Sequence, residues 1–304
     1  MLEKSAAPIV FIDLADRPEM SSVLISRLGA RKLDLERRLF PDGEHYVRLL
    51  GSVESCRAVV LIDLSRPDSS LLPLIFLSDL LREMGALSVI LLAPYLAYMR
   101  QDIRFKPGEA ISSRSFARLL SRHVDALVTV DPHLHRYHAL SEIYSIPAQA
   151  VSAVGVIAAW IREHVENPLL IGPDAESAQW VDAVARQAGA PSQVLEKIRH
   201  GDRDVEVSMP ELERFQQCTP ILVDDIVSSG RTMLETLRHL QHLQLPPAVC
   251  IAVHGLFADD SYAQLKAAGI RALVSSNSVA HVSNALDVSE LLLQGLEQLG
   301  QEMI

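Results

Sequence analysis

The chain has 304 residues and a formal net charge of −10, with 49% hydrophobic and 22% charged residues. This length can form two α/β units of about 150 residues each or one larger unit, and the composition is that of a globular protein. The acidic balance argues against broad binding to nucleic acid or to an anionic membrane surface. No stretch has the length and apolar character of a signal peptide or a membrane span. Cys56, Cys218 and Cys250 lie far apart without CxxC spacing, which indicates reduced thiols in a cytoplasmic protein.

The first half of the chain alternates short apolar runs with a helical pattern. Buried strands are predicted at 9–12, 58–64, 88–94 and 126–131. Between them, residues 71–84 have helical periodicity, and Gly85 is a typical residue for the end of a helix.

The second half repeats this rhythm. Strands are predicted at 169–171, 193–195, 221–223, 249–254 and 272–275, and helices at 177–188, 232–243, 260–268 and 288–302. Such alternation predicts an α/β fold in which mostly parallel sheets are flanked by helices. The boundary between the halves is placed at 147–152, which gives two domains at 1–148 and 149–304.

Residues 221–232 combine a predicted strand, two acids, a loop of small residues and a helix start. Free N–H groups at a helix start, hydroxyls and a glycine that permits close approach together make a cradle for phosphate. The neighbouring carboxylates can accept hydrogen bonds from sugar hydroxyls. An ordinary strand-to-helix connection is the alternative, but the coincidence of these features favours a sugar-phosphate site. Its candidate residues are Asp224, Asp225, Ser228, Ser229, Gly230, Arg231 and Thr232.

Two further segments are ambiguous when each is taken alone. Phe-Pro-Asp-Gly-Glu at 40–44 is typical of a hairpin turn. The segment 94–109 follows a predicted strand and carries Arg100, Arg104 and Lys106, which suit a polyphosphate but also suit a solvated loop.

Histidines, an acid and a cationic pair form the remaining candidates. His133 and His135 would share one face of an extended segment, yet no thiolate or His-x-x-x-His pair supports a zinc site. Asp174 follows a strand and could cap a helix or bind a metal. Lys197 and Arg199 begin a polar stretch that reads either as a mobile lid carrying two cations or as a solvated hairpin.

These motifs resemble those of the ribose-phosphate pyrophosphokinase family from residue 40 to residue 277. The family patterns are Phe-x-Asp-Gly-Glu, Pro-Tyr-x-x-Tyr-x-Arg-Gln-Asp, Val-Asp-x-His and the acid pair with its phosphate loop. The match at 94–109 is the most specific of them. The chain also lacks the P-loop and Gly-x-Gly-x-x-Gly sequences, so it is neither a P-loop kinase nor an ordinary dinucleotide-binding protein or protein kinase.

The resemblance implies a role for each candidate residue. It assigns ATP binding to Phe40, Asp42, Glu44, Arg100 and Gln101, magnesium binding to His133 and Asp174, and transition-state stabilisation to Lys197 and Arg199. The loop at 224–232 would bind ribose 5-phosphate. The implied fold is two phosphoribosyltransferase-like domains, in homo-oligomers that are dimers or hexamers.

The sequence departs from the family pattern in four places. Gly172 replaces a serine, Arg231 replaces a glycine, and Pro132 with Leu134 changes the setting of the histidines. Common bacterial members also continue into a C-terminal extension that takes part in inter-subunit and allosteric contacts. This sequence ends at Ile304, so we expect a form without that extension.

The resemblance implies a Mg²⁺-dependent reaction in which the anomeric hydroxyl of ribose 5-phosphate attacks the β-phosphorus of ATP. The products would be phosphoribosyl pyrophosphate and AMP. A phosphoribosyltransferase is one alternative, but it would need no nucleotide motifs at 40–44 and 94–109. A second is a pyrophosphokinase that acts on a different pentose phosphate, and a third is a catalytically silent regulatory subunit.

Overall fold

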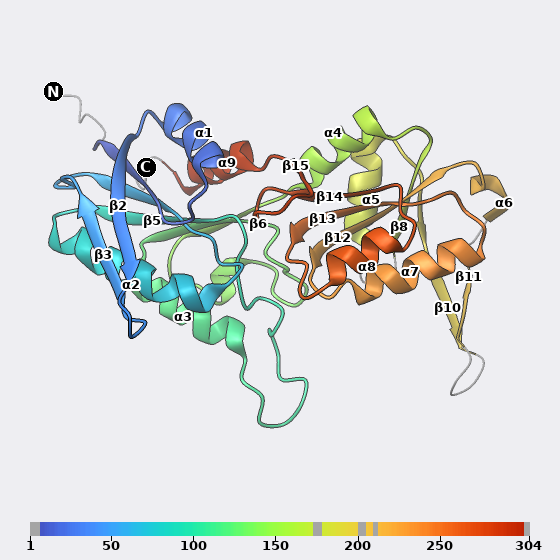
Figure 1. Ribbon diagram of the computed structural model, residues 1–304, viewed down its shortest axis with the longest axis horizontal. Coiled ribbons are helices and arrows are strands. Elements are labelled where there is room, and N and C mark those ends of the chain that lie inside the picture. Colours follow the sequence, from blue (N-terminus) through green and yellow to red (C-terminus); the bar gives the residue numbers. More distant parts are fainter. Residues whose placement is uncertain (1–6, 173–177, 200–204, 209–211, 301–304) are drawn as a thin grey trace. The chain divides into compact units, whose positions relative to one another are not determined.

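The computed structural model describes residues 7–172, 178–199, 205–208 and 212–300. The chain divides into two compact units, one containing Met1–Ser152 and Val288–Ile304 and the other containing Ala153–Asp287 (Figure 1). The last helix therefore belongs to the first unit, which a single division at residue 148 does not anticipate. In the described part of the chain, no helix has the length and apolarity needed to cross a membrane.

The first unit is built on a seven-stranded sheet in the order β3-β2-β1-β4-β5-β6-β7. All neighbouring strands are parallel except β2 and β3, which form an antiparallel hairpin. The strands are β1 (Ile9–Asp13), β2 (Arg31–Leu39), β3 (His45–Leu50), β4 (Arg57–Leu61), β5 (Ser88–Ala93), β6 (Ala126–Val130) and β7 (Ala148–Val151).

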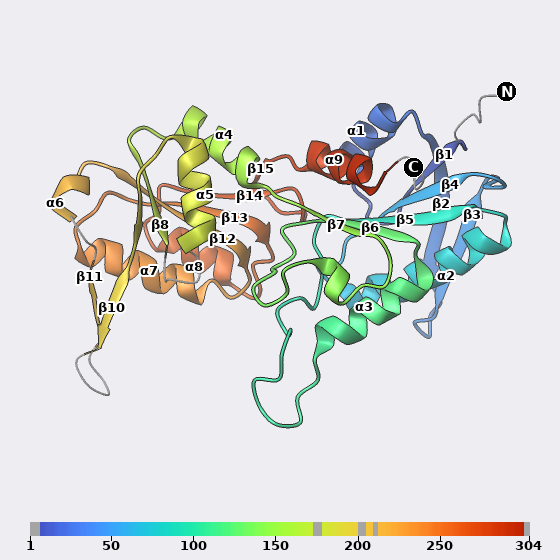
Figure 2. The same ribbon diagram turned by 180° about the vertical axis from the view of Figure 1, so that it is seen from behind.

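Helices cover both faces of this sheet, with α1 and α9 on one face and α2 and α3 on the other (Figures 1 and 2). They are α1 (Pro18–Leu28), α2 (Pro67–Glu83), α3 (Ser112–His123) and α9 (Ser289–Leu299), and a short 3₁₀ turn η1 covers Leu140–Glu142. Helix α9 approaches the sheet closely at Gly295, where an added Cβ would lie 2.3 Å from Val128 and 3.0 Å from Val151. This glycine lets the end of the chain pack on β6 and β7.

The second unit is built on a six-stranded parallel sheet in the order β15-β14-β13-β12-β8-β9. Its strands are β8 (Pro168–Gly172), β9 (Ser192–Val194), β12 (Thr219–Val227), β13 (Val249–Gly255), β14 (Ala272–Ser276) and β15 (Asn284–Leu286). A separate antiparallel pair consists of β10 (Glu196–Arg199) and β11 (Val205–Ser208).

Helices α4 (Val154–His164) and α5 (Ala178–Ala188) lie on one face of this sheet, and α7 (Arg231–His242) and α8 (Ser261–Ala267) lie on the other (Figures 1 and 2). A short helix, α6, covers Leu212–Phe215. Beneath α7 and α8, Leu222, Met233, Leu237 and Leu265 belong to one buried apolar cluster. This packing fixes the start of α7 against the end of β12, where the predicted phosphate loop lies.

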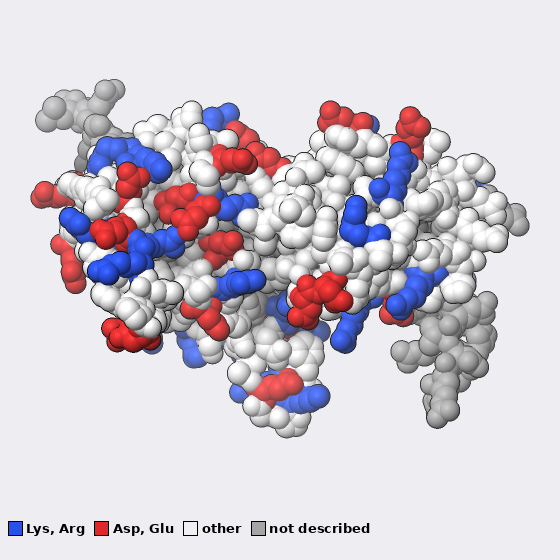
Figure 3. All heavy atoms as spheres, viewed as in Figure 1, with Lys and Arg blue, Asp and Glu red and all other residues white. Residues whose placement is uncertain are grey.

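The prediction of mostly parallel sheets flanked by helices is confirmed. The central strands are nearly continuous apolar runs, because a parallel sheet covered on both faces leaves no solvent side. The β2–β3 hairpin lies at the edge of its sheet and carries alternating charged and apolar residues, so no strand was predicted there. Figure 3 shows acidic and basic side chains interspersed over the exposed face of the first unit.

Candidate active site

The segments that the sequence singled out follow the carboxyl ends of parallel strands within each unit. In the first unit these strands are β2, β5 and β6, and in the second unit the strand is β12. Ligands of α/β proteins bind at this edge of the sheet, because the loops that connect strands to helices gather there. Each unit therefore presents one candidate binding edge.

In the second unit, residues 228–230 connect β12 directly to α7. Gly230 precedes the first helical residue with a φ of 66°, a left-handed conformation that glycine adopts without strain. The Leu234 N–H donates to the Gly230 carbonyl at 2.9 Å and closes the first helical turn. An α-helix has no intrahelical acceptors for its first N–H groups, so this turn presents donors and a positive dipole end to an anion.

The main chain of this phosphate loop is held by the segment that follows β13. The Ser228 carbonyl accepts hydrogen bonds from the Ala258 N–H at 3.0 Å and from the buried Ser261 hydroxyl at 2.9 Å. An added Cβ at Gly230 would lie 3.2 Å from the side chain of Leu265. The loop conformation is therefore fixed by contacts within the unit, while Ser229 and Thr232 remain exposed.

The two acids lie within β12, which is a correction to the predicted strand end at Val223. The strand continues because Ile226 and Val227 are apolar and pair with His254 and Gly255 of β13. Asp224 and Asp225 are half-buried, and adjacent strand residues point to opposite faces of a sheet. The Asp225 carboxylate accepts a hydrogen bond from the Ile226 N–H at 2.8 Å.

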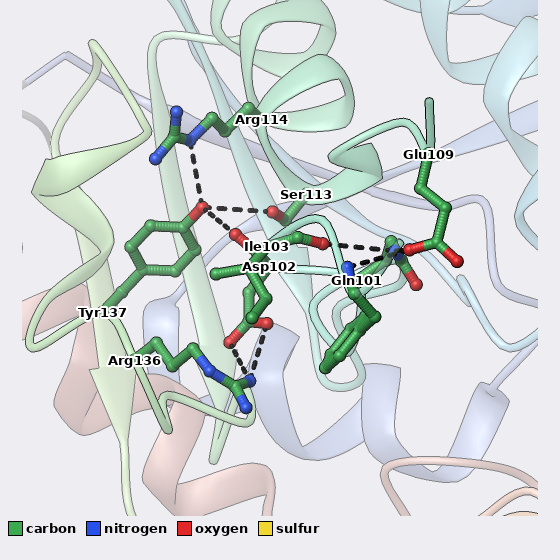
Figure 4. A network of polar contacts seen from close by, with 9 residues as sticks. Gln101, Asp102, Ile103, Glu109, Ser113, Arg114, Arg136 and Tyr137 are labelled. Atoms are coloured by element: carbon green, nitrogen blue, oxygen red, sulfur yellow. Dashed lines mark hydrogen bonds and ion pairs between the residues drawn. The ribbon is translucent and has the colours of Figure 1, made fainter. Parts of the chain in front are cut away.

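In the first unit, the segment 94–111 connects β5 to α3 and carries Arg100 and Gln101. Gln101 and its contacts are drawn in Figure 4. The Gln101 amide donates to the Ile103 carbonyl at 3.2 Å and to the Glu109 carboxylate at 3.4 Å. The same Glu109 oxygen accepts the N–H groups of Phe105 and Lys106, each at 2.9 Å. Glu109 thus closes the loop on itself.

Asp102 anchors this segment to the rest of the unit. Its carboxylate is 2% exposed and accepts hydrogen bonds from Arg136 Nη1 at 2.9 Å and 3.1 Å. The Tyr137 hydroxyl donates to the Asp102 carbonyl at 3.0 Å and receives a hydrogen bond from Arg114 Nε at 3.2 Å. These contacts surround Asp102 in Figure 4.

Tyr98, in the same segment, has an altered acidity. Its hydroxyl donates to the Asp68 carboxylate at 2.9 Å. This hydrogen bond raises the pKa of Tyr98, and burial and the negative charge of Asp68 raise the pKa further. Tyr98 also has a φ of 64° and lies against Phe116. Its phenol therefore stays protonated and ties the segment to α2 and α3.

The predicted adenine-binding group lies at the turn between β2 and β3. Phe40 is 37% exposed, and the Arg38 guanidinium lies 4.7 Å from its ring centroid. The turn is closed by hydrogen bonds from the Phe40 N–H to the Glu44 carbonyl and from the Glu44 N–H to the Asp42 carboxylate. Strands β1 and β4 separate β2 from β5. The turn and the segment after β5 thus share an edge but are offset by about 14 Å, three strand spacings.

The histidine segment follows β6, the neighbour of β5, and has an unusual backbone. Asp131 and His133 have φ values of 32° and 55°, in the left-handed region that is uncommon for residues other than glycine. The His133 N–H donates to the Asp131 carbonyl, and the His135 N–H donates to the His133 carbonyl. These tight turns bring the two imidazole rings to a centroid separation of 4.1 Å.

Three predicted residues are described incompletely or not at all. Asp174 lies outside the described residues. Lys197 and Arg199 lie on β10 and pair with Val207 and Val205 of β11. Their backbone therefore forms an antiparallel ladder, and their side chains lie outside the described part.

Several residues that shape the site had no predicted role. Asp102, Glu109 and Arg136 stand inside or beside the sequence motifs, but only the folded chain reveals their partners. Asp102 and Arg136 are 34 residues apart, a separation at which no local pattern indicates pairing. Ser261 had no signal beyond its place at the start of a predicted helix.

Two family profiles match this chain, and together they cover most of both units. The profile of the N-terminal domain of ribose phosphate pyrophosphokinase matches residues 9–123, and the phosphoribosyl transferase domain profile matches residues 139–288. The first profile lies within the first unit, and the second covers the whole second unit together with residues 139–152 and 288 of the first.

Three curated relatives are named ribose-phosphate pyrophosphokinase and resemble this chain over most of their length. The protein of Methanopyrus kandleri is 33% identical over 91% of this chain and 94% of its own. The protein of Sulfolobus acidocaldarius is 31% identical, with coverage of 89% and 93%, and that of Halobacterium salinarum is 30% identical, with coverage of 90% and 96%.

The fold is also similar to that of a solved structure. The crystal structure of phosphoribosylpyrophosphate synthetase from Mycobacterium smegmatis aligns with a TM-score of 0.82 and 23% sequence identity. The alignment covers 96% of this chain and 100% of that chain. The two proteins share one fold.

Proposed function

The chain belongs to the ribose-phosphate pyrophosphokinase family, and from this premise we propose that it transfers the diphosphoryl group of ATP to ribose 5-phosphate. The products are phosphoribosyl pyrophosphate and AMP. The anomeric oxygen forms a bond to the β-phosphorus, and the bond from that phosphorus to the α-phosphate oxygen breaks. AMP leaves, and the hydroxyl proton passes to solvent.

The main support for this proposal is the conformation of the phosphate loop in the second unit. Its main chain is held in place by Ala258 and Ser261, and its first helical turn directs N–H groups towards an anion. The 5-phosphate binds there, and the half-buried Asp224 and Asp225 accept hydrogen bonds from the ribose hydroxyls. This arrangement fixes both ends of the sugar, which diphosphoryl transfer requires for in-line attack.

ATP binds at the carboxyl edge of the first unit. Arg100 and Gln101 bind its phosphates, and Phe40 contacts the adenine, with Asp42 and Glu44 beside the nucleotide. The exposed face of Phe40 suits stacking on a base, because an aromatic ring offers a large apolar surface. The offset between the turn and the loop gives the nucleotide room to lie along the edge of the sheet.

His133 suits a divalent cation whose remaining ligands are oxygens. Mg²⁺ prefers oxygen ligands and usually completes its shell with water and substrate phosphates, so one imidazole from a rigid turn is compatible with it. His133 and Asp174 would hold the ion. When bound, it offsets charge on the transferring phosphates.

Lys197 and Arg199 carry the transition-state role in this proposal. Both residues belong to β10, whose backbone pairs with β11. Charge that develops on the transferring group would be balanced by these two side chains.

The proposal is tested by AMP release from ATP and Mg²⁺, with and without ribose 5-phosphate. Wild type should release AMP only with the sugar, and Lys197→Ala should be slower by roughly a hundredfold or more. AMP release that is independent of the sugar would contradict the proposal. An unchanged rate in the variant would remove Lys197 from the mechanism.

Arg231 favours a second candidate, a pyrophosphokinase for another pentose phosphate. It is exposed at the first position of α7, where the family usually has glycine, and it adds a positive charge beside the phosphate loop. Such a charge suits a sugar with an additional anionic group. A higher kcat/KM for that sugar than for ribose 5-phosphate would favour this candidate. Binding of ribose phosphate without turnover would instead indicate a regulatory subunit.

A further inference from the structure

The ion pair between Asp102 and Arg136 joins two segments that the proposed function places at one ligand. Asp102 follows Arg100 and Gln101 directly, and Arg136 follows His133 by three residues. One guanidinium nitrogen contacts both carboxylate oxygens, at 2.9 Å and 3.1 Å (Figure 4). The pair therefore lies between the proposed phosphate-binding loop and the proposed metal-binding segment.

The backbone next to Asp102 is held as firmly as its side chain. The Asp102 carbonyl accepts the Tyr137 hydroxyl at 3.0 Å, and the Gln101 carbonyl accepts the Ser113 N–H at 3.3 Å. Tyr137 and Ser113 are both buried. The two peptide groups after Arg100 are thus fixed to the start of α3 and to the histidine segment.

Beyond Asp102 the loop is exposed. Ile103 is 37% exposed and Phe105 is 54% exposed, and the Arg136 guanidinium lies 5.3 Å from the Phe105 ring centroid. Arg136 therefore contacts the loop at two places, at the buried Asp102 and at the exposed Phe105. Asp102 marks the point where the fixed part of the segment ends and the solvent-exposed part begins.

Stability alone is a poor explanation for this pair. Burial of a carboxylate is unfavourable unless it is paired, and the guanidinium that pairs with it is 45% exposed, so the net gain in stability from this pair is small. A directional pair is better suited to fixing the register of two segments. In this unit, the two segments are the loop proposed to bind ATP and the histidine segment proposed to bind the cation.

We propose that Asp102 and Arg136 are positioning residues that tie the ATP-binding loop to the histidine segment and so set the affinity for ATP. The inference rests on the proposed function, because it takes Arg100, Gln101 and His133 as ligand-binding residues. Neither Asp102 nor Arg136 need touch ATP. Loss of the pair should release Arg100 and Gln101 from their position and leave the second unit unchanged.

The test measures KM for each substrate separately, together with binding of a non-hydrolysable ATP analogue. Arg136→Gln and Asp102→Asn should each raise KM for ATP and weaken analogue binding about tenfold, while KM for ribose 5-phosphate changes less than twofold. Arg136→Lys should recover only part of the affinity, because an ammonium group cannot match the planar guanidinium. The double variant Asp102→Asn/Arg136→Gln should be no worse than either single variant, because both remove one interaction.

A matched control separates positioning from general loss of an ion pair. Arg82 pairs with Asp125 at 3.1 Å in the same unit, and both side chains are partly exposed. Arg82→Gln should leave both KM values unchanged. The double variant leaves neither charge unpaired, so it is used for the same measurements where a single variant is unstable.

The possible results distinguish the positioning role of the ion pair from the proposed function. Equal changes in both KM values, additive effects in the double variant, or a similar effect of Arg82→Gln would overturn the positioning role while leaving the proposed function intact. A wild-type protein that neither turns over nor binds ATP would overturn the proposed function, and this inference with it.

Discussion

The two candidate binding regions are held in place by different means. In the phosphate loop, the Ser228 carbonyl is bound by neighbouring donors and Gly230 adopts a conformation that suits glycine. In the ATP segment, an ion pair between the side chains of Asp102 and Arg136 accompanies the hydrogen bonds from Tyr137 and Ser113 to the main chain. Both regions depend on contacts with residues 33 or 34 positions away in the chain. The first is held through a main-chain carbonyl and the second through a pair of charged side chains, so a single side-chain substitution removes the second contact completely.

The largest effect on the phosphate loop is expected from Gly230→Ala. A left-handed conformation costs a residue with a side chain about 1–2 kcal/mol, and the new Cβ would lie 3.2 Å from Leu265. The loop should therefore shift, and KM for ribose 5-phosphate should rise roughly tenfold. Steady-state kinetics with each substrate in turn checks this, and KM for ATP serves as the internal control. An unchanged KM for the sugar phosphate would show that the loop tolerates another conformation.

A smaller effect is expected from Ser261→Ala. This variant removes one of two hydrogen bonds to the Ser228 carbonyl and keeps the Ala258 N–H. Loss of about 1 kcal/mol corresponds to a rise of roughly fivefold in KM for ribose 5-phosphate. Ser261→Thr keeps a hydroxyl and should restore most of the affinity. If the alanine and threonine variants behave alike, the hydroxyl has no role in holding the loop.

The phosphate loop could be predicted from the sequence because its pattern is local, whereas contacts between distant residues could not. The order of strand, acids, loop and helix at 221–232 lies within twelve consecutive residues, and this order alone predicts the phosphate loop. The contacts of the loop with Ala258 and Ser261 are not needed for the prediction. The error concerned the end of β12, since the carboxylates of Asp224 and Asp225 interrupt the apolar run although Ile226 and Val227 continue the ladder. The strand extends to Val227 because Ile226 and Val227 are buried and paired, although two acids precede them.

Other features depend on partners that lie far away in the chain. Gly295 gave no local signal that α9 returns to the first unit, because its role is close contact with Val128 and Val151. The β2–β3 hairpin lies at a sheet edge, where alternating charges replace a buried apolar run. The Asp102–Arg136 pair likewise became visible only once the fold placed β5 beside β6.

Diphosphoryl transfer from ATP to ribose 5-phosphate can be recognised from the identity of its products. ³¹P NMR of the wild-type protein with ATP, ribose 5-phosphate and Mg²⁺ follows every phosphorus in the mixture. We expect AMP and a sugar diphosphate ester to appear in equal amounts. Formation of ADP and a ribose bisphosphate, which transfer of a single phosphoryl group would give, would contradict it.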